Sequence, residues 1–178
     1  MPSIDQDYLL GYNGGLVLKH FSERVAGIQL EFNLSQKGWQ ENYDTVNFYQ
    51  RRINYFEIPF FTSFKIGKKN TKFIANVGPH IAYKLSEDVV TDGNENLFAE
   101  SHHFHDVIRD YEYGISVGLG LAHEFNKNIL QLEIRYAQGF NNIFNDFNDY
   151  DPHASQNQTL SIGITYLYTV FSYQKTKK

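Results

Sequence analysis

Apolar and polar residues alternate with a strict period of two along seven segments of the chain. The clearest segment starts at Tyr111, where the odd positions up to Leu121 are large and apolar and the even positions up to Ala122 are small or polar. Because successive side chains of a strand point to opposite faces, this alternation predicts strands with one apolar face. The predicted strands are 8–19, 25–35, 51–66, 72–85, 111–124, 129–140 and 158–169.

The connections between these strands are alternately short and long. The short ones are 21–24, 67–71 and 126–127, and the long ones are 36–50, 86–110 and 141–157. Outer-membrane barrels have short periplasmic turns, long outer loops and strands of about 9–11 residues. The chain is therefore predicted to be an all-β, antiparallel up-and-down β-barrel in one domain over residues 1–178, with 170–178 as a C-terminal tail.

Seven strands would place the two ends of the barrel on opposite sides of the membrane. Single-chain bacterial barrels have an even number of strands, so we expect an eighth strand before Met1 in the native protein, with residues 1–7 as the remnant of an outer loop. Residues 1–7 also lack the basic and apolar regions of a secretory signal. The sequence leaves open whether residues 1–178 close into a barrel without that strand.

The composition suits strands at a membrane. The chain has 15 phenylalanine and 13 tyrosine residues among 178, and aromatic residues are enriched in strands and at membrane interfaces. The mean hydropathy of −0.46 does not count against a membrane barrel, because only every second residue of a transmembrane strand contacts lipid. Aromatic girdles are expected at the strand ends, from Tyr8, Tyr12, Phe125, Tyr136, Phe140, Tyr166 and Tyr168.

Charge and cysteine content exclude other functions. The formal net charge is −4 and the only basic run is the short tail 175–178, so no nucleic-acid binding is expected. The chain has no cysteine, which excludes disulfides and thiolate metal sites.

A soluble, lipocalin-like barrel that binds a small apolar ligand is the alternative to a membrane barrel. In such a protein the apolar face lines a cavity and the polar face is wetted, so the polar face should be rich in lysine and glutamate. Here the polar face consists mainly of Gly, Ala, Ser, Asn and Gln, with scattered charges. This composition favours a narrow interior, and therefore a barrel in the bacterial outer membrane.

Four short motifs occur in a characteristic order, and the resemblance that they carry covers nearly the whole chain from Gly11 onward. They are SQKGW at 35–39, YFEIP at 55–59, VGP at 77–79 and EIRYAQG at 133–139. As an ordered set they resemble the PorT-like outer-membrane β-barrel family. The resemblance implies an eight-stranded barrel in the outer membrane, with some family members linked to protein secretion. The chain departs from the family's pattern because the usual signal peptide and first strand are absent and because 169–178 runs past the usual terminal strand.

Charged residues on the polar face are the main candidates for a functional site. Glu31, Glu57, Glu133 and Arg135 are predicted near mid-height, with His80 and Lys84 on the same side. An eight-stranded barrel is just wide enough for side chains to fill it, and a carboxylate buried there must be paired or protonated. We expect a polar network that plugs the barrel. A gated or proton-sensitive passage is the alternative, because the acids outnumber the bases.

Metal binding and cofactors are not expected. His102, His103 and His105 are weak candidates for metal ligands, but a long loop does not provide the fixed cage of a structural site. The predicted partners are outer-membrane lipid and a protein that contacts the outer loops 36–50, 86–110 and 141–157.

Enzymatic activity is not expected either. His123, with Ser116 or Glu124 beside it in the sequence, is the only arrangement that suggests catalysis. The alternation places His123 on the opposite face from both, so a catalytic triad does not assemble.

Overall fold

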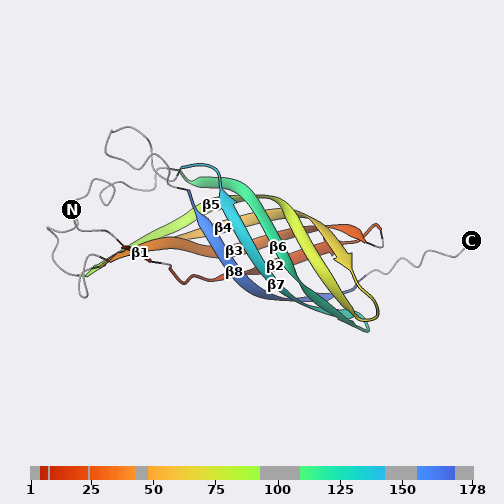
Figure 1. Cartoon of the computed structure of the whole chain (residues 1–178). Coiled ribbons are helices and arrows are strands. Elements are labelled where there is room, and N and C mark those ends of the chain that lie inside the picture. Colours follow the sequence, from red (N-terminus) through yellow and green to blue (C-terminus); the bar gives the residue numbers. More distant parts are fainter. Residues whose placement is uncertain are drawn as a thin grey trace, which may run out of the picture.

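The fold is one strongly curled antiparallel sheet (Figure 1). The computed structural model describes residues 5–7, 9–23, 25–42, 48–92, 109–142 and 156–170. From β2 to β8, each strand pairs with the next one in the sequence. The seven long strands are β2 (Asn13–His20), β3 (Ala26–Asn42), β4 (Phe48–Ile66), β5 (Thr71–Asp92), β6 (Tyr111–Phe125), β7 (Asn128–Gly139) and β8 (Gln158–Tyr168). The predicted all-β, up-and-down arrangement of seven antiparallel strands is confirmed.

The three short connections lie together at one end of the sheet, on the right of Figure 1. Two of them turn through a residue with a left-handed backbone, Lys69 at φ 58° between β4 and β5 and Asn126 at φ 56° between β6 and β7. No helix that could cross a membrane occurs among the residues that the structure describes.

Several strands have limits that differ from the predicted ones. β2 begins at Asn13, five residues later than predicted, whereas β3 continues to Asn42 and β5 to Asp92. The predicted outer loops 36–50 and 86–110 therefore begin as strand. The three-residue strand β1 (Asp5–Asp7) pairs with the end of β3. The apolar alternation stops before the pairing does, because the outward face becomes mainly polar from Gln36 and Ser86 onward.

Pro59 and Pro79 interrupt the ladders but do not shift the register. The β3–β4 ladder lacks the pairs beside Pro59, and the β4–β5 ladder lacks the pairs beside Pro79, because proline has no N–H to donate. The register shift of the β4–β5 ladder lies between Asn54 and Tyr55, opposite an additional residue, Leu85.

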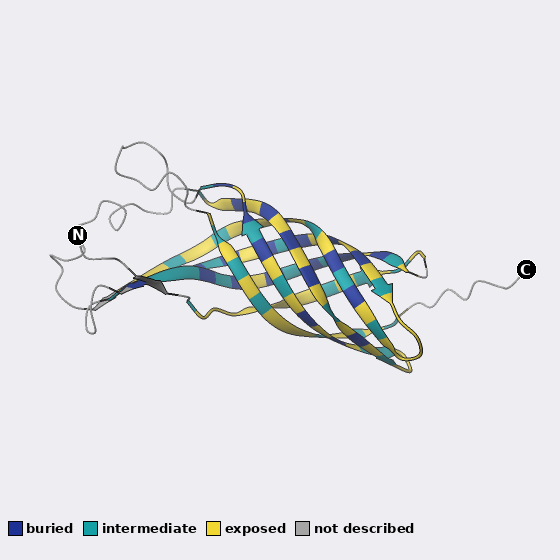
Figure 2. Cartoon of the chain, in the orientation of Figure 1, coloured by how far each residue is buried: buried dark blue, intermediate teal, exposed yellow. Residues whose placement is uncertain are grey.

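Buried and exposed residues alternate along the strands (Figure 2). The exposed residues are mainly apolar and face outward, and most of the buried ones are polar and face inward. On β6, for example, Leu119 is 63% exposed and Ser116 is fully buried. A soluble binder with an apolar interior requires the reverse, so that alternative is wrong. The small apolar core of Ile53, Tyr55 and Ala82 lies towards the long-loop end, with Trp39 packed against it.

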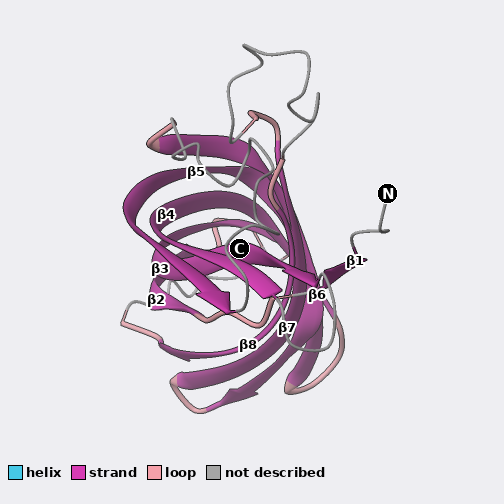
Figure 3. Ribbon diagram, turned by 90° about the vertical axis from the view of Figure 1, so that its left-hand side faces the viewer, coloured by secondary structure: helices cyan, strands magenta, loops and turns pink. Residues whose placement is uncertain are grey.

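β2 and β8 are the two edges of the sheet. β2 pairs only with β3 and β8 only with β7 among the described residues. The end-on view in Figure 3 shows the sheet curling round between these edges. Because six antiparallel pairings separate β2 from β8, these two strands run in the same direction.

Candidate functional site

The middle of the interior holds a charged cluster centred on Arg135, which we call the mid-barrel cluster: Lys19, Glu31, Asn76, Glu133 and Arg135. The guanidinium of Arg135 donates to both carboxylate oxygens of Glu31 at 2.7 and 2.8 Å, and its Nε donates to Glu133 at 2.8 Å. A planar guanidinium can bridge two carboxylates in this way, which an ammonium group cannot do with the same geometry. Arg135 therefore joins strand β7 to β3 across the interior.

Neutral side chains complete the hydrogen bonds of both carboxylates. Glu31 accepts from Gln29 and Asn33, its neighbours on the inner face of β3. Glu133 accepts from Gln131 and from Asn76 on β5. On its other side the guanidinium lies 4.6 Å from the centre of the Phe61 ring. With Lys19 as a second cation nearby, donating to Gln131 at 3.1 Å, the mid-barrel cluster holds two cations and two carboxylates.

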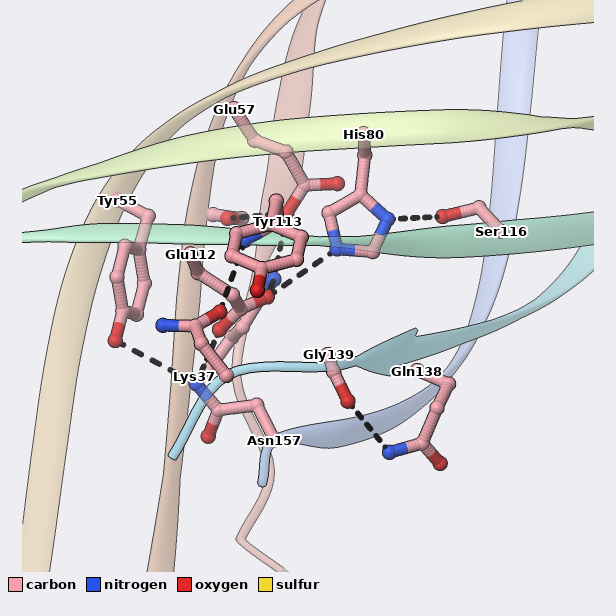
Figure 4. Close-up of polar contacts among 12 residues, drawn as sticks. Lys37, Tyr55, Glu57, His80, Glu112, Tyr113, Ser116, Gln138, Gly139 and Asn157 are labelled. Carbon is pink, nitrogen blue, oxygen red and sulfur yellow. Dashed lines mark hydrogen bonds and ion pairs between the residues drawn. The ribbon is translucent and has the colours of Figure 1, made fainter. Parts of the chain in front are cut away.

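A second cluster lies closer to the long-loop end (Figure 4), and we call it the outer cluster: Lys37, Glu57, His80, Glu112 and Ser116. The Lys37 ammonium lies 2.8 Å from Glu57 and 2.7 Å from Glu112. His80 Nε2 is 3.3 Å from Glu112, and His80 Nδ1 is 2.9 Å from the Ser116 hydroxyl. Four strands, β3 to β6, each contribute to this cluster.

Glycines on β6 make room for both clusters. A Cβ on Gly118 would overlap the Glu133 carboxylate, and a Cβ on Gly114 would come within 2.7 Å of the His80 ring. The small residues that alternate along β6 therefore mark the places where larger side chains from β5 and β7 cross the interior.

The structure places all five predicted interior residues on the inner face, in two groups. Glu31, Glu133 and Arg135 lie in the mid-barrel cluster, and Glu57 and His80 in the outer cluster. Lys84 also faces inward, but at the outer rim, where it pairs with Glu87 and Asp110.

Sequence reasoning missed Glu112 and Lys37, the two residues that hold the outer cluster together. Glu112 occupies an even, inward position of β6, so its alternation could have identified it. Lys37 could not be placed, because it stood in a predicted loop.

The order Ser116–His80–Glu112 has the chemical composition of a hydrolase triad. However, these side chains are buried in the interior, with Ser116 at 0% and His80 at 1% exposure, so a substrate cannot reach the hydroxyl. His123, the histidine that the sequence suggested for catalysis, is exposed on the opposite face from Ser116. The geometry supports a structural hydrogen-bond chain.

Among the described residues no group of three or more metal-ligating side chains gathers. The candidates His102, His103 and His105 lie outside these residues.

A comparison with protein families supplies the identity of this architecture. Residues 2–145 match the family described as the outer membrane protein beta-barrel domain. The chain belongs to this family. Neither the curated proteins nor the solved structures that were compared gave a match. The family, with the outward apolar face, places the protein in the bacterial outer membrane, so the short turns lie in the periplasm and the long connections lie outside.

Within this barrel domain, a polar row marks the outer limit of the hydrocarbon. Gln36, Asn54 and Ser86 lie side by side on the outward face of β3, β4 and β5. Asn54 accepts from Gln36 at 3.0 Å and from the Tyr12 hydroxyl at 3.1 Å, and donates to Ser86 at 2.9 Å. Below this row the outward residues are apolar, for example Phe56.

Above the polar row, β3, β4 and β5 continue into water as a three-stranded extension, which we call the outer extension (residues 36–42, 48–54 and 86–92). On its inner side Arg51 pairs with Glu87 and lies 5.7 Å from the Trp39 ring. Burial raises the pKa of the neighbouring Tyr49 hydroxyl. The outer extension is therefore packed and charged on the inner side.

Aromatic residues ring the strand ends on the outward face. The described members of the predicted girdles are all exposed: Tyr12, Phe125, Tyr136, Phe140, Tyr166 and Tyr168. The side chain of Tyr8 lies outside the described residues.

At the periplasmic mouth, Phe21 turns inward over Gly27, where a Cβ would clash with its ring. Lys65 lies 4.2 Å and Lys19 5.4 Å from the centre of that ring. Lys65 also pairs with Glu124 at 3.5 Å. Side chains therefore occupy the interior from the periplasmic mouth to the outer cluster.

Proposed function

We propose that this protein is a non-conducting, non-catalytic scaffold of the outer membrane, with a structural, adhesive or secretion-accessory role. The observation that carries the proposal is the filled interior. Charge-assisted hydrogen bonds connect β3 to β7 in the mid-barrel cluster, and β3 to β4 and β6 in the outer cluster. Breaking a buried ion pair costs about 3–5 kcal/mol. An ion would have to break two such clusters to pass.

The filled interior also argues against the proton-sensitive passage. In the mid-barrel cluster each carboxylate has a cationic partner, as Glu31 and Glu133 share Arg135. In the outer cluster Glu57 and Glu112 share Lys37. The charged groups of the interior are therefore paired in a way that holds the strands together.

The surface available to a protein partner is the outer extension, together with the connections that the sequence places at 36–50, 86–110 and 141–157. Its convex face carries amide and charged groups, including Gln40 and Gln50, which are bonded across the strands at 3.3 Å. We infer a PorT-like member of the family from the order of the four sequence motifs. That resemblance favours a secretion-accessory role.

Planar-bilayer recordings test the non-conducting interior. The refolded protein should give no discrete current steps in 1 M KCl, and Gly118→Ala, which disturbs the mid-barrel cluster without removing a charge, should leave the bilayer silent as well. Regular current steps from the unaltered protein would overturn the proposal.

A second test addresses the outer extension. Joining Gly38 to Arg52, which are paired residues, by an Asn-Gly turn removes its β3–β4 tip. The shortened protein should still show heat-dependent gel mobility, and cells that produce it should lose secretion or adhesion. Unchanged secretion and adhesion would contradict the proposed role of this surface.

We propose that one further strand, antiparallel to both β2 and β8, closes the barrel. Unpaired strand edges are not tolerated in hydrocarbon, and among the described residues β2 and β8 approach each other without forming a ladder. Cysteines at Val17 and at Ser161, Gly163 or Thr165 test this in the native protein, because an intervening strand holds the edges about 10 Å apart. A quantitative disulfide from any of these pairs would contradict it.

A further inference from the structure

Two neighbouring periplasmic turns expose a set of lysines, which we call the lysine rim: Lys68, Lys69, Lys72 and Lys127. Lys68 and Lys69 come from the turn between β4 and β5, Lys72 is the second residue of β5, and Lys127 comes from the turn between β6 and β7. The Glu124 amide donates to the Asn70 carbonyl at 2.8 Å, which holds the two turns side by side. Lys68, Lys69 and Lys127 are exposed.

The rim lysines differ from Lys37, Lys65 and Lys84 in their partners. Lys37, Lys65 and Lys84 each form an ion pair with a glutamate. In the part of the chain that the structure describes, no carboxylate pairs with any of the four rim lysines, and Lys72 donates to the carbonyl of Lys69. The positive charge of the rim is thus not neutralised within these residues.

The rim continues directly from the lipid-facing surface. Ile66 and Phe73, which flank the β4–β5 turn, are 67% and 71% exposed on the outward face. Lys68 and Lys69 follow Ile66 by two and three residues. At about 3.3 Å of rise per residue and with flexible stems, their ammonium groups reach the headgroup layer.

The opposite end of the barrel has the opposite charge. Segments 86–110 and 141–157, which connect strands on the outer side, contain seven and three acidic residues and a single basic one, Arg109.

We propose that the lysine rim binds the anionic headgroups of phospholipids in the periplasmic leaflet. A lipid fits better than a macromolecular partner, because the rim follows the strand ends and is continuous with the hydrocarbon-facing surface. Lysine ammonium groups bind phosphate as point charges without a fixed cage. An anionic membrane surface attracts each nearby lysine, and salt screens this attraction.

Spin-labelled lipids measure this preference directly. The refolded protein is placed in phosphatidylcholine vesicles with a trace of labelled phosphatidylglycerol or labelled phosphatidylcholine, and the immobilised fraction of each is compared. We expect about a two- to threefold preference for phosphatidylglycerol. The variant K68Q/K69Q/K127Q should lose it, K68R/K69R/K127R should keep it, and 1 M NaCl should reduce it. Heat-dependent gel mobility shows that each variant is folded.

Two results would overturn the proposal. One is an equal immobilised fraction for both lipids, or a preference that the glutamine variant retains. The other is co-sedimentation of the detergent-solubilised protein with peptidoglycan sacculi, lost in the glutamine variant, without any lipid preference. That outcome would assign the rim to the cell wall.

Discussion

The mid-barrel and outer clusters both neutralise two buried glutamates, but they do so with different cations. Both bury two glutamates between strands that are distant in the sequence, but Arg135 joins Glu31 and Glu133 through a planar fork, whereas Lys37 joins Glu57 and Glu112 through a single ammonium. The mid-barrel cluster is balanced by a second cation, Lys19. In the outer cluster the group beside Lys37 is His80, which is charged only when protonated. We therefore expect the mid-barrel cluster to contribute more to the stability of the barrel than the outer cluster.

The largest effect should come from Arg135→Met. This change leaves Glu31 and Glu133 buried without their shared cation, which should lower the free energy of unfolding by about 3–5 kcal/mol. Urea titration in lipid vesicles, read by gel mobility, measures it. Arg135→Lys keeps the charge but not the planar guanidinium, so its free energy of unfolding should lie between those of the unaltered protein and Arg135→Met. A loss below about 1 kcal/mol for Arg135→Met would remove the proposed difference between the clusters.

Lys37→Met should have a smaller effect, about 1–3 kcal/mol at neutral pH. Lys37 makes one contact with each of its two carboxylates, whereas Arg135 donates three hydrogen bonds to Glu31 and Glu133, so fewer interactions are lost. The same urea titration checks this. A loss equal to that of Arg135→Met would show that the two clusters are equivalent.

Gly118→Ala should cost about 1–3 kcal/mol, because the added methyl group displaces the Glu133 carboxylate. Gly163→Ala on β8 is the matched control, since a Cβ there meets nothing within 4 Å. It should be nearly neutral in the same titration. Equal losses for the two variants would mean that β-strand conformation, and not the space for Glu133, decides the result.

The sequence was sufficient to predict the strands and their faces, because a two-residue period and short turns are local properties. Residues 111–124 were predicted almost to the residue. The outer extension was missed because its outward positions, such as Gln36 and Asn54, are polar although the strands still pair. Where water replaces lipid, alternation no longer reports a strand.

The partners within the interior could not be predicted. Strand alternation shows that Glu31 and Arg135 face the interior, but it does not give the curl that brings β3 opposite β7. Lys37 could not be assigned to the inner face, because the outer extension that contains it was predicted to be a loop. The role of Gly118 required the position of Glu133 on the neighbouring strand.

The measurement that tests the filled interior most directly is the reactivity of a cysteine at Ser116, in a protein that has no other cysteine. Ser116→Cys is nearly isosteric and lies at a fully buried position. In lipid vesicles it should resist a small water-soluble maleimide and react only after unfolding, whereas Gln50→Cys on the outer extension should react at once. Labelling of Ser116→Cys as fast as Gln50→Cys in the folded protein would show a water-filled interior and contradict the account.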